Sequence, residues 1–174
     1  DSSKLQLIKR GAIFINASRG EVVDPEALLR CSERFAGMVL DVFKGEPLNI
    51  DRRLFDRADI VSPHIAGYSF EGKINGTAAV VQKFAAHFGK DFVPLHSATP
   101  EIEIPWGVFD CGNSENSYFQ MVDAFTDSLL SIFPLLQTDK ELRRSPEMFE
   151  HIRNVYDYRR EFLVPEYISK LSNR

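Results

Sequence analysis

The segment AIFINASRGEVVDPEALL, residues 12–29, indicates the fold class of the chain. Its first four residues form a continuous apolar run, rich in β-branched and aromatic side chains, which is typical of a strand buried on both faces. The run should end near Asn16. Asp24 then supplies an N-cap, and Pro25 occupies the first position of a helix, where proline is favoured. The segment therefore predicts a buried strand followed by a helix.

The same strand signature recurs twice further along the chain. Met38–Val42 and Asp59–Ser62 are short apolar runs, each separated from the preceding strand by the length of a helix or a loop. Strands that alternate with helices form parallel sheets with right-handed crossovers. Apolar residues at spacings of three and four between Ser69 and Phe88 predict one long helix after the third strand. The first part of the chain is therefore expected to be an α/β domain.

The composition changes after this long helix, which marks a candidate domain boundary. Residues 93–112 carry prolines and glycines at irregular spacings, which indicates the start of a different module. Two further helices are predicted beyond them, over residues 118–136 and from about Ser145 onward. The helix that begins near Ser145 is expected to carry four apolar or aromatic residues on one face: Phe149, Ile152, Val155 and Tyr156. We therefore expect two domains, residues 1–89 and residues 90–174, the second being a small α+β module.

Length and composition exclude several classes of protein. With 174 residues, of which 44% are apolar, the chain is expected to fold around a core. Its 21 Lys and Arg against 25 Asp and Glu leave a net charge of −4, which argues against a nucleic-acid-binding surface. No apolar run approaches the roughly 18 residues that span a bilayer, and no signal pattern opens the sequence, so no membrane contact and a cytoplasmic location are expected. Cys31 and Cys111 lie far apart without clustered histidines, which predicts neither a disulfide framework nor a metal site.

Polar side chains follow each of the three predicted strands. Arg19 comes after the first strand, Asp41 and Glu46 at and after the second, and His64 after the third. Ligands of open parallel sheets bind at the carboxyl ends of the strands, so these residues should meet at one edge. An arginine fork matches a carboxylate, and a histidine can exchange a proton near neutral pH. The arrangement predicts a site for an α-hydroxy or α-keto acid.

Glu46 and Asp41 have different expected parts in this site. A carboxylate beside an imidazole orients the ring and stabilises its protonated form, and Glu46 would do this for His64. Asp41, at the end of a buried strand, could accept a hydrogen bond from a carboxamide of a ligand. It could equally be a strand-end carboxylate whose hydrogen bonds are satisfied within the chain, and the sequence alone leaves both alternatives open.

The same segments resemble a known family. The motifs that carry the resemblance are INASRGEVVD at residues 15–24, LDV at 40–42, EP at 46–47 and PHIAG at 63–67. They are similar to the second half of the NAD-binding domain of the NAD-dependent D-isomer-specific 2-hydroxyacid dehydrogenases. The sequence after the long helix, including YDYRRE at residues 156–161, is similar to a C-terminal dimerisation domain found in that family. The resemblance implies a Rossmann-type parallel sheet, NAD as cofactor, a small 2-hydroxy acid as substrate and a homodimer.

The resemblance also implies a role for each matched residue. Arg19 would bind the carboxylate of the substrate and polarise the reacting oxygen, while His64 would be the acid and base on the C2 hydroxyl. Glu46 would pair with His64, and Tyr68 would touch the substrate. The residues that would line the nicotinamide side of the cofactor are Ala17, Ser18, Arg19, Asp41 and Gly67.

Parts of the family pattern are missing from this sequence. No two glycines lie closer than four positions, so the Gly-x-Gly-x-x-Gly cradle for a dinucleotide phosphate is absent, as is the acid that would hold the adenosine ribose. We therefore expect a C-terminal fragment that neither binds NAD tightly nor turns over by itself. The sequence does not distinguish NAD from NADP. Alternative interpretations are a dehydrogenase for another hydroxy acid, an NAD-sensing binding module without catalysis, and an oligomerisation module.

Overall fold

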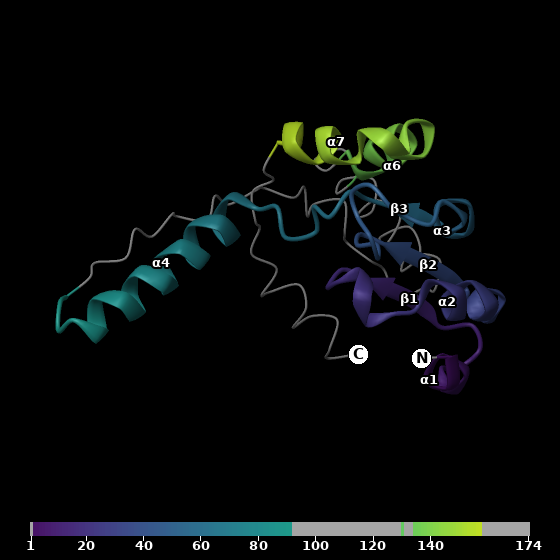
Figure 1. Ribbon diagram of the computed structural model, residues 1–174, viewed down its shortest axis with the longest axis horizontal. Coiled ribbons are helices and arrows are strands. Elements are labelled where there is room, and N and C mark those ends of the chain that lie inside the picture. Colours follow the sequence, from purple (N-terminus) through teal and green to yellow (C-terminus); the bar gives the residue numbers. More distant parts are fainter. Residues whose placement is uncertain (1, 92–129, 131–133, 158–174) are drawn as a thin grey trace, which may run out of the picture. The chain divides into compact units, whose positions relative to one another are not determined.

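The computed structural model describes residues 2–91, residue 130 and residues 134–157 (Figure 1). The chain divides into two compact units. The first unit contains residues 1–66 and 134–156, and the second contains residues 67–133 and 157–174.

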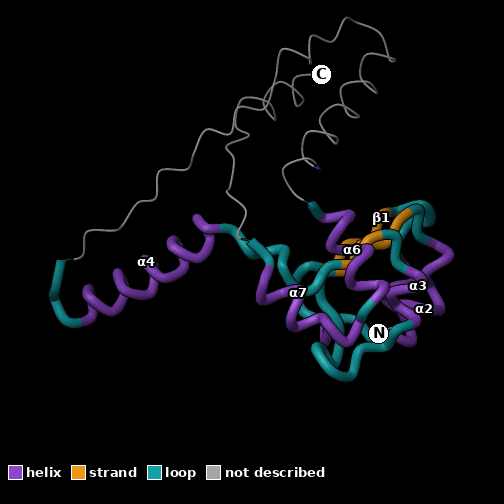
Figure 2. Tube along the Cα trace, turned by 90° about the horizontal axis from the view of Figure 1, so that it is seen from above, coloured by secondary structure: helices purple, strands orange, loops and turns teal. Residues whose placement is uncertain are grey.

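A parallel sheet lies at the centre of the first unit. Its strands, drawn in orange in Figure 2, are β1 (Ile13–Asn16), β2 (Gly37–Leu40) and β3 (Ile60–Val61), and they lie in the order β1-β2-β3. Ile13 pairs with Gly37 in the first ladder, and Val39 pairs with Ile60 in the second; both ladders are parallel. The predicted α/β class and its three strands are confirmed.

Helices flank the strands in the first unit. They are α1 (Ser2–Leu7), α2 (Pro25–Cys31), α3 (Arg53–Arg57), α6 (Leu135–Arg144) and α7 (Phe149–Val155), with single turns of 3-10 helix at Gly20–Val22, Ser32–Arg34 and Pro146–Met148. The side chain of Asp24 accepts a hydrogen bond from the backbone N–H of Ala27 at 3.3 Å, and Pro25 opens α2. The predicted start of this helix is confirmed.

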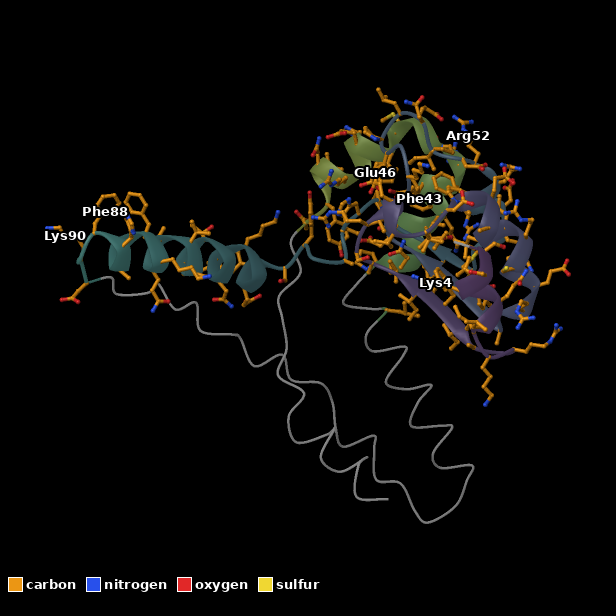
Figure 3. The ribbon with its side chains drawn as sticks, turned by 60° about the horizontal axis from the view of Figure 1, so that its bottom comes forward. Lys4, Phe43, Glu46, Arg52, Phe88 and Lys90 are labelled. Carbon is orange, nitrogen blue, oxygen red and sulfur yellow. The ribbon has the colours of Figure 1, made fainter. Side chains whose placement is uncertain are left out.

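The core of the first unit lies between the sheet and these helices. Phe43, which is labelled in Figure 3, follows β2 and is 1% exposed. It packs edge-on against Phe55 of α3, with 4.9 Å between the ring centroids. It also meets Phe149 of α7 edge-on at 6.1 Å. Burying one such side chain contributes about 1.5–3 kcal/mol, and edge-to-face geometry adds to this. Segments from both ends of the sequence therefore share one core.

Strand β1 differs from its prediction, because only one of its faces is covered. Ile13 and Ile15 are 68% and 65% exposed, whereas Phe14 between them packs against the core. Successive side chains of a strand point to opposite faces. Within the parts of the chain that the structure describes, nothing covers the face that carries Ile13 and Ile15, so burial on both faces was a wrong prediction.

The region after residue 89 differs from its prediction in part. The helix predicted over residues 118–136 lies almost wholly outside the described residues. Helix α6, which was not predicted, begins at Leu135 and packs against β3. The next helix is confirmed as α7, with Phe149 and Ile152 buried, but Val155 is 61% exposed and does not belong to its buried face. The domain boundary between residues 89 and 90 stays a prediction.

Helix α4 (Phe70–His87) is the main described element of the second unit, and it confirms the long helix predicted over residues 69–88. Ser69 caps it by accepting a hydrogen bond from the N–H of Gly72 at 3.0 Å. Just before the helix, the Tyr68 ring lies under the Lys73 ammonium, with Nζ 4.3 Å from the ring centroid. Among the described residues, no helix has the length and apolar character needed to cross a membrane.

Candidate active site

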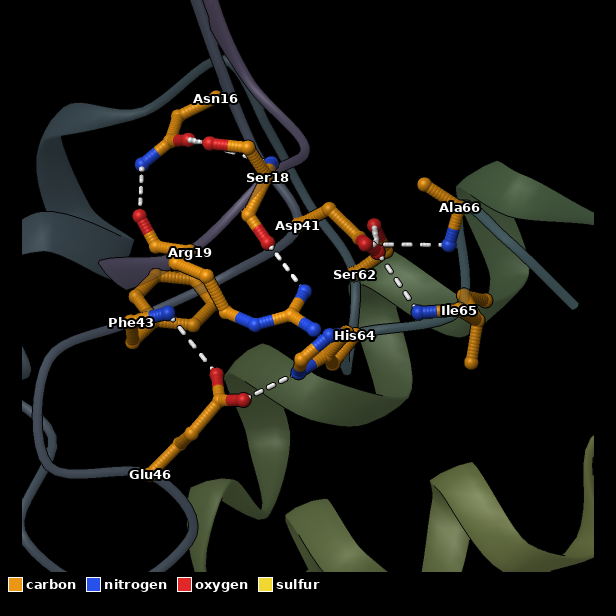
Figure 4. A network of polar contacts seen from close by, with 10 residues as sticks. All are labelled: Asn16, Ser18, Arg19, Asp41, Phe43, Glu46, Ser62, His64, Ile65 and Ala66. Carbon is orange, nitrogen blue, oxygen red and sulfur yellow. Dashed lines mark hydrogen bonds and ion pairs between the residues drawn. The ribbon is translucent and has the colours of Figure 1, made fainter. Parts of the chain in front are cut away.

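The loop after β1 is closed by contacts between near neighbours in the sequence (Figure 4). Asn16, at the end of the strand, accepts hydrogen bonds from the N–H of Ser18 at 3.3 Å and from its hydroxyl at 3.2 Å. The amide of Asn16 donates to the backbone oxygen of Arg19 at 3.1 Å. Asn16 is itself buried, so it anchors the exposed turn of Ala17, Ser18 and Arg19 to the sheet.

The guanidinium of Arg19 is available to a ligand. Among the described residues it forms one hydrogen bond, from Nη1 to the backbone oxygen of Ser18 at 2.6 Å. The side chain is exposed and extends in the direction of His64 in Figure 4. Because the remaining donors form a planar fork, Arg19 can bind a carboxylate through two parallel hydrogen bonds.

The Arg19 loop touches the loop after β2 through Gly20. A Cβ atom on Gly20 would lie 2.0 Å from the carbonyl carbon of Phe43 and 2.2 Å from the nitrogen of Lys44. Both neighbours are backbone atoms, which cannot shift as easily as the end of a flexible side chain. Only glycine therefore allows the two loops to approach this closely.

Asp41 fixes the turn that follows β3. Its carboxylate is 3% exposed and accepts hydrogen bonds from the hydroxyl of Ser62 at 2.6 Å, from the N–H of Ile65 at 2.8 Å and from the N–H of Ala66 at 3.0 Å. The backbone oxygen of Asp41 accepts from the N–H of His64 at 2.7 Å. The sequence left two alternatives open for Asp41. These contacts agree with the second, a strand-end carboxylate whose hydrogen bonds are satisfied within the chain. Its contact with a cofactor stays a prediction.

His64 and Glu46 form a hydrogen-bonded pair. Nδ1 of His64 lies against Oε1 of Glu46, and Oε2 of Glu46 accepts from the N–H of Phe43 at 2.9 Å. Both side chains are mostly buried, with exposed fractions of 23% for His64 and 19% for Glu46. When the carboxylate of Glu46 is ionised it only accepts hydrogen bonds, so Nδ1 of His64 is then the donor in this pair. No hydrogen bond joins Nε2 of His64 to the described residues.

The backbone of His64 is also unusual. Its φ of 57° lies in the left-handed region, which costs a residue other than glycine about 1–3 kcal/mol. The hydrogen bonds from this turn to Asp41 hold His64 in that conformation. Strained backbone of this kind is often found at functional sites.

The predicted site residues are thus partly brought together. Glu46 and His64 are in contact, whereas Arg19 bonds to neither of them. Gly67 and Tyr68 begin the second unit, where the oxygen of Gly67 accepts from the N–H of Ser69 at 3.0 Å. The roles of all these residues in catalysis and binding stay predictions.

Sequence reasoning missed two residues that build the site, Asn16 and Ser62. Both are short polar residues at strand ends, where a side chain can bond nearby backbone or a neighbouring strand end. The position of Asn16 and Ser62 at strand ends was therefore the sequence signal that could have identified them. No group of three or more His, Cys, Asp or Glu side chains that could hold a metal ion occurs within the described part of the chain.

Comparison with known proteins gives consistent matches. Residues 1–66 match the family profile described as "D-isomer specific 2-hydroxyacid dehydrogenase, NAD binding domain". The erythronate-4-phosphate dehydrogenase of Porphyromonas gingivalis (strain ATCC BAA-308 / W83) is 37% identical over 155 residues, which are 86% of this chain and 39% of that protein. The protein of the same name from Shigella dysenteriae serotype 1 (strain Sd197) is 44% identical over 107 residues, 59% of this chain and 28% of that protein.

A solved structure also matches. It is a putative D-isomer specific 2-hydroxyacid dehydrogenase from Polaromonas sp. JS6 66, 30% identical, covering 56% of this chain and 31% of its own, with a TM-score of 0.43. The chain spans about two fifths of the length of the first curated relatives, between 39% and 44% for four of them. Residues 1–66 therefore resemble the NAD-binding domain of the D-isomer specific 2-hydroxyacid dehydrogenases, and the chain as a whole is similar to erythronate-4-phosphate dehydrogenases.

Proposed function

We propose that the protein containing this chain is an NAD-dependent dehydrogenase that oxidises 4-phospho-D-erythronate to 2-oxo-3-hydroxy-4-phosphobutanoate, a step in the biosynthesis of pyridoxal 5'-phosphate. The observation that carries the proposal is the His64–Glu46 pair, which leaves Nε2 of His64 open at the carboxyl edge of the sheet. The names of the relatives supply the substrate. The exposed fork of Arg19, in the neighbouring loop, supports a substrate with a carboxylate.

Each of the three residues has a distinct part in this reaction. Arg19 binds the substrate carboxylate and orients C2. Nε2 of His64 takes the proton of the C2 hydroxyl as the C2–O bond becomes a carbonyl, and returns it in the reverse direction. Glu46 fixes the ring through Nδ1 and stabilises the imidazolium that forms. The nicotinamide cofactor, when bound, would supply the acceptor for the hydride of C2.

The residues expected to hold the nicotinamide end of the cofactor fit that task in part. Ala17 and Ser18 are exposed at the carboxyl end of β1, where cofactors of such sheets bind. A carboxylate has about four lone-pair sites, and Asp41 uses three of them within the chain. Asp41 is 3% exposed, and its contact with a carboxamide of the cofactor is proposed from the resemblance alone. The part of Gly67 is proposed from the resemblance alone.

The chain by itself is proposed to be inactive. It contains no Gly-x-Gly-x-x-Gly motif, so it lacks the backbone cradle for the pyrophosphate of the cofactor. Titration of the purified 174 residues with NAD⁺ in a calorimeter should give no tight binding. Dehydrogenase activity of this piece would contradict the proposal.

The complete protein is proposed to be a cytoplasmic homodimer that associates through residues 90–174. This proposal is supported by the similarity of the chain to its relatives beyond the NAD-binding domain, which extends over 93% of the chain in one case. Sedimentation of the complete gene product at high micromolar concentration should give a dimer. A monomer under those conditions would contradict the proposed assembly and leave the reaction unaffected.

A steady-state assay tests the reaction. The complete gene product should prefer 4-phospho-D-erythronate to 3-phosphoglycerate and D-lactate. His64→Asn should lower kcat about 10²- to 10⁴-fold, the usual contribution of a general acid or base. Asparagine tolerates the left-handed backbone better than alanine does, so the pair His64→Asn and His64→Ala separates loss of the imidazole from loss of the turn.

The outcomes of this assay have different meanings. Preference for another hydroxy acid would keep the mechanism and replace the substrate. Activity that survives in both variants would remove His64 from the mechanism. Binding of NAD⁺ without oxidation of any of the three acids would favour a sensing module.

A further inference from the structure

Strand β3, which leads to His64, is held along its outer edge by helix α6. The N–H of Val61 donates to Oδ1 of Asp139 at 2.7 Å, and Val61 is fully buried. On its other edge β3 pairs with β2. The carboxylate of Asp139 therefore accepts the hydrogen bond that a further strand of the sheet could otherwise accept from Val61.

Arg143 extends this contact to the end of helix α3. Its Nε donates to both carboxylate oxygens of Asp139, at 3.0 and 2.9 Å. Nη1 donates to the backbone oxygen of Phe55, and Nη2 donates to those of Ala58 at 2.8 Å and Asp59 at 3.2 Å. These carbonyls belong to the last turn of α3 and to the residues that lead into β3. One guanidinium thus fixes where α3 ends and β3 begins.

These contacts bear on the position of His64, which lies three residues after Val61. Asp41 holds the turn that carries His64 from the side of β2, through Ser62, Ile65 and the backbone of His64 itself. Asp139 holds the strand that feeds this turn from the opposite side. The two carboxylates therefore set the register of the segment from both edges, and that register decides where the imidazole meets Glu46.

We propose that Asp139 and Arg143 are positioning residues for the acid and base of the reaction, acting through β3 on His64. The consequence for the reaction rests on the proposed function of His64, whereas the consequence for the geometry of the His64–Glu46 pair does not. A segment far outside residues 1–66, the part that matches the family profile, would then set the alignment of the catalytic histidine.

The test uses the complete gene product with Asp139→Asn, Arg143→Lys and a matched control. Glu141→Gln is the control because Glu141 lies on the same helix and accepts a hydrogen bond from Gln137 at 2.9 Å, in an exposed pair within that helix. For the folded Asp139→Asn variant we expect kcat to fall about ten- to a hundredfold, since small displacements of a reacting group have effects of this size. KM for the substrate should change less than about twofold, because the binding groups keep their places. Arg143→Lys should shift kcat in the same direction, and Glu141→Gln should leave both constants unchanged.

A second measurement is independent of turnover. Nuclear magnetic resonance of ¹⁵N-histidine-labelled protein follows the proton that His64 Nδ1 shares with Glu46. We expect its resonance to shift or broaden in Asp139→Asn and Arg143→Lys, and to stay in place in Glu141→Gln. If the wild-type protein oxidises none of the acids tested but these shifts occur, the positioning role holds and the proposed function fails.

The inference is overturned by one clear result. In a folded Asp139→Asn protein, a wild-type kcat and an unchanged His64 resonance, together with a lowered melting temperature, would reduce Asp139 to a purely structural role. If Asp139→Asn does not fold, Arg143→Lys decides by the same two measurements, because it keeps the charge and removes only the fork.

Discussion

The loop that carries Arg19 and the turn that carries His64 are built in opposite ways. The Arg19 loop is closed by Asn16, three residues earlier, and the side chain of Arg19 is exposed. The His64 turn is tied to Asp41, more than twenty residues earlier, by buried hydrogen bonds, and its imidazole is mostly buried. The difference teaches that a group that must adapt to a ligand can lie on a locally closed loop. A group whose alignment matters is held by contacts between separate strands.

The largest effect on stability is expected for Asp41→Ala, which removes the contacts that hold the His64 turn. The substitution removes three hydrogen bonds to a buried carboxylate, which should lower the free energy of unfolding by about 3 kcal/mol or more. Denaturant unfolding of the purified protein measures this loss. Asn16→Ala is the matched change in the Arg19 loop and should cost only about 1 kcal/mol. Equal losses in the two variants would contradict the difference between the two segments.

Gly20→Ala probes the place where the Arg19 loop meets the loop after β2. The added methyl group would overlap backbone atoms of Phe43 and Lys44, so the loops must move apart at a cost of about 1–3 kcal/mol. Thermal unfolding is a suitable measurement. The control is Gly76→Ala, since Gly76 lies inside α4 with open space around its Cβ position, and alanine there should stabilise the helix by up to about 1 kcal/mol. A stabilising effect of Gly20→Ala would show that the loops are not in such close contact.

The smallest effect on stability is expected for a local contact at the surface, the pair of Arg53 and Asp51. The Arg53 guanidinium hydrogen-bonds Asp51 and lowers the pKa of that carboxyl below its ordinary value of 3.8. A lowered pKa in the folded state stabilises the protein above the ordinary pKa, and this contribution is lost as the pH falls through the lowered value. The difference in melting temperature between wild type and Arg53→Ala should therefore be small at pH 6 and shrink further below about pH 4. A difference that grows on acidification would have the wrong sign.

The sequence predicted the elements that lead to the site, for identifiable reasons. Three short apolar runs mark the strands, and Asp24 with Pro25 marks the start of α2, because these signals are local. Residues directly after the strands share one edge of a parallel sheet, which explains why Glu46 and His64 could be expected to meet. The sequence motifs around these residues indicated the resemblance to the dehydrogenase family.

The rest was not visible because it depends on residues far apart in the sequence. An apolar run such as that around Ile13 and Ile15 shows which side chains avoid water but does not show which element covers them. Asp139 and Arg143, four residues apart in a polar helix, look like an ordinary solvated ion pair. Their backbone partners lie between 78 and 88 residues away, and no local pattern points to them.

The contact between Asp139 and Val61 has one more consequence, for self-association. Among the described residues β3 ends the sheet, and a strand in that position offers its outward N–H groups to any other extended chain. Asp139 already occupies the outward N–H of Val61 and places a negative charge beside it. An incoming strand would have to displace a carboxylate and its bound arginine before it could pair. The same contact that secures the strand internally therefore also protects this edge against aggregation.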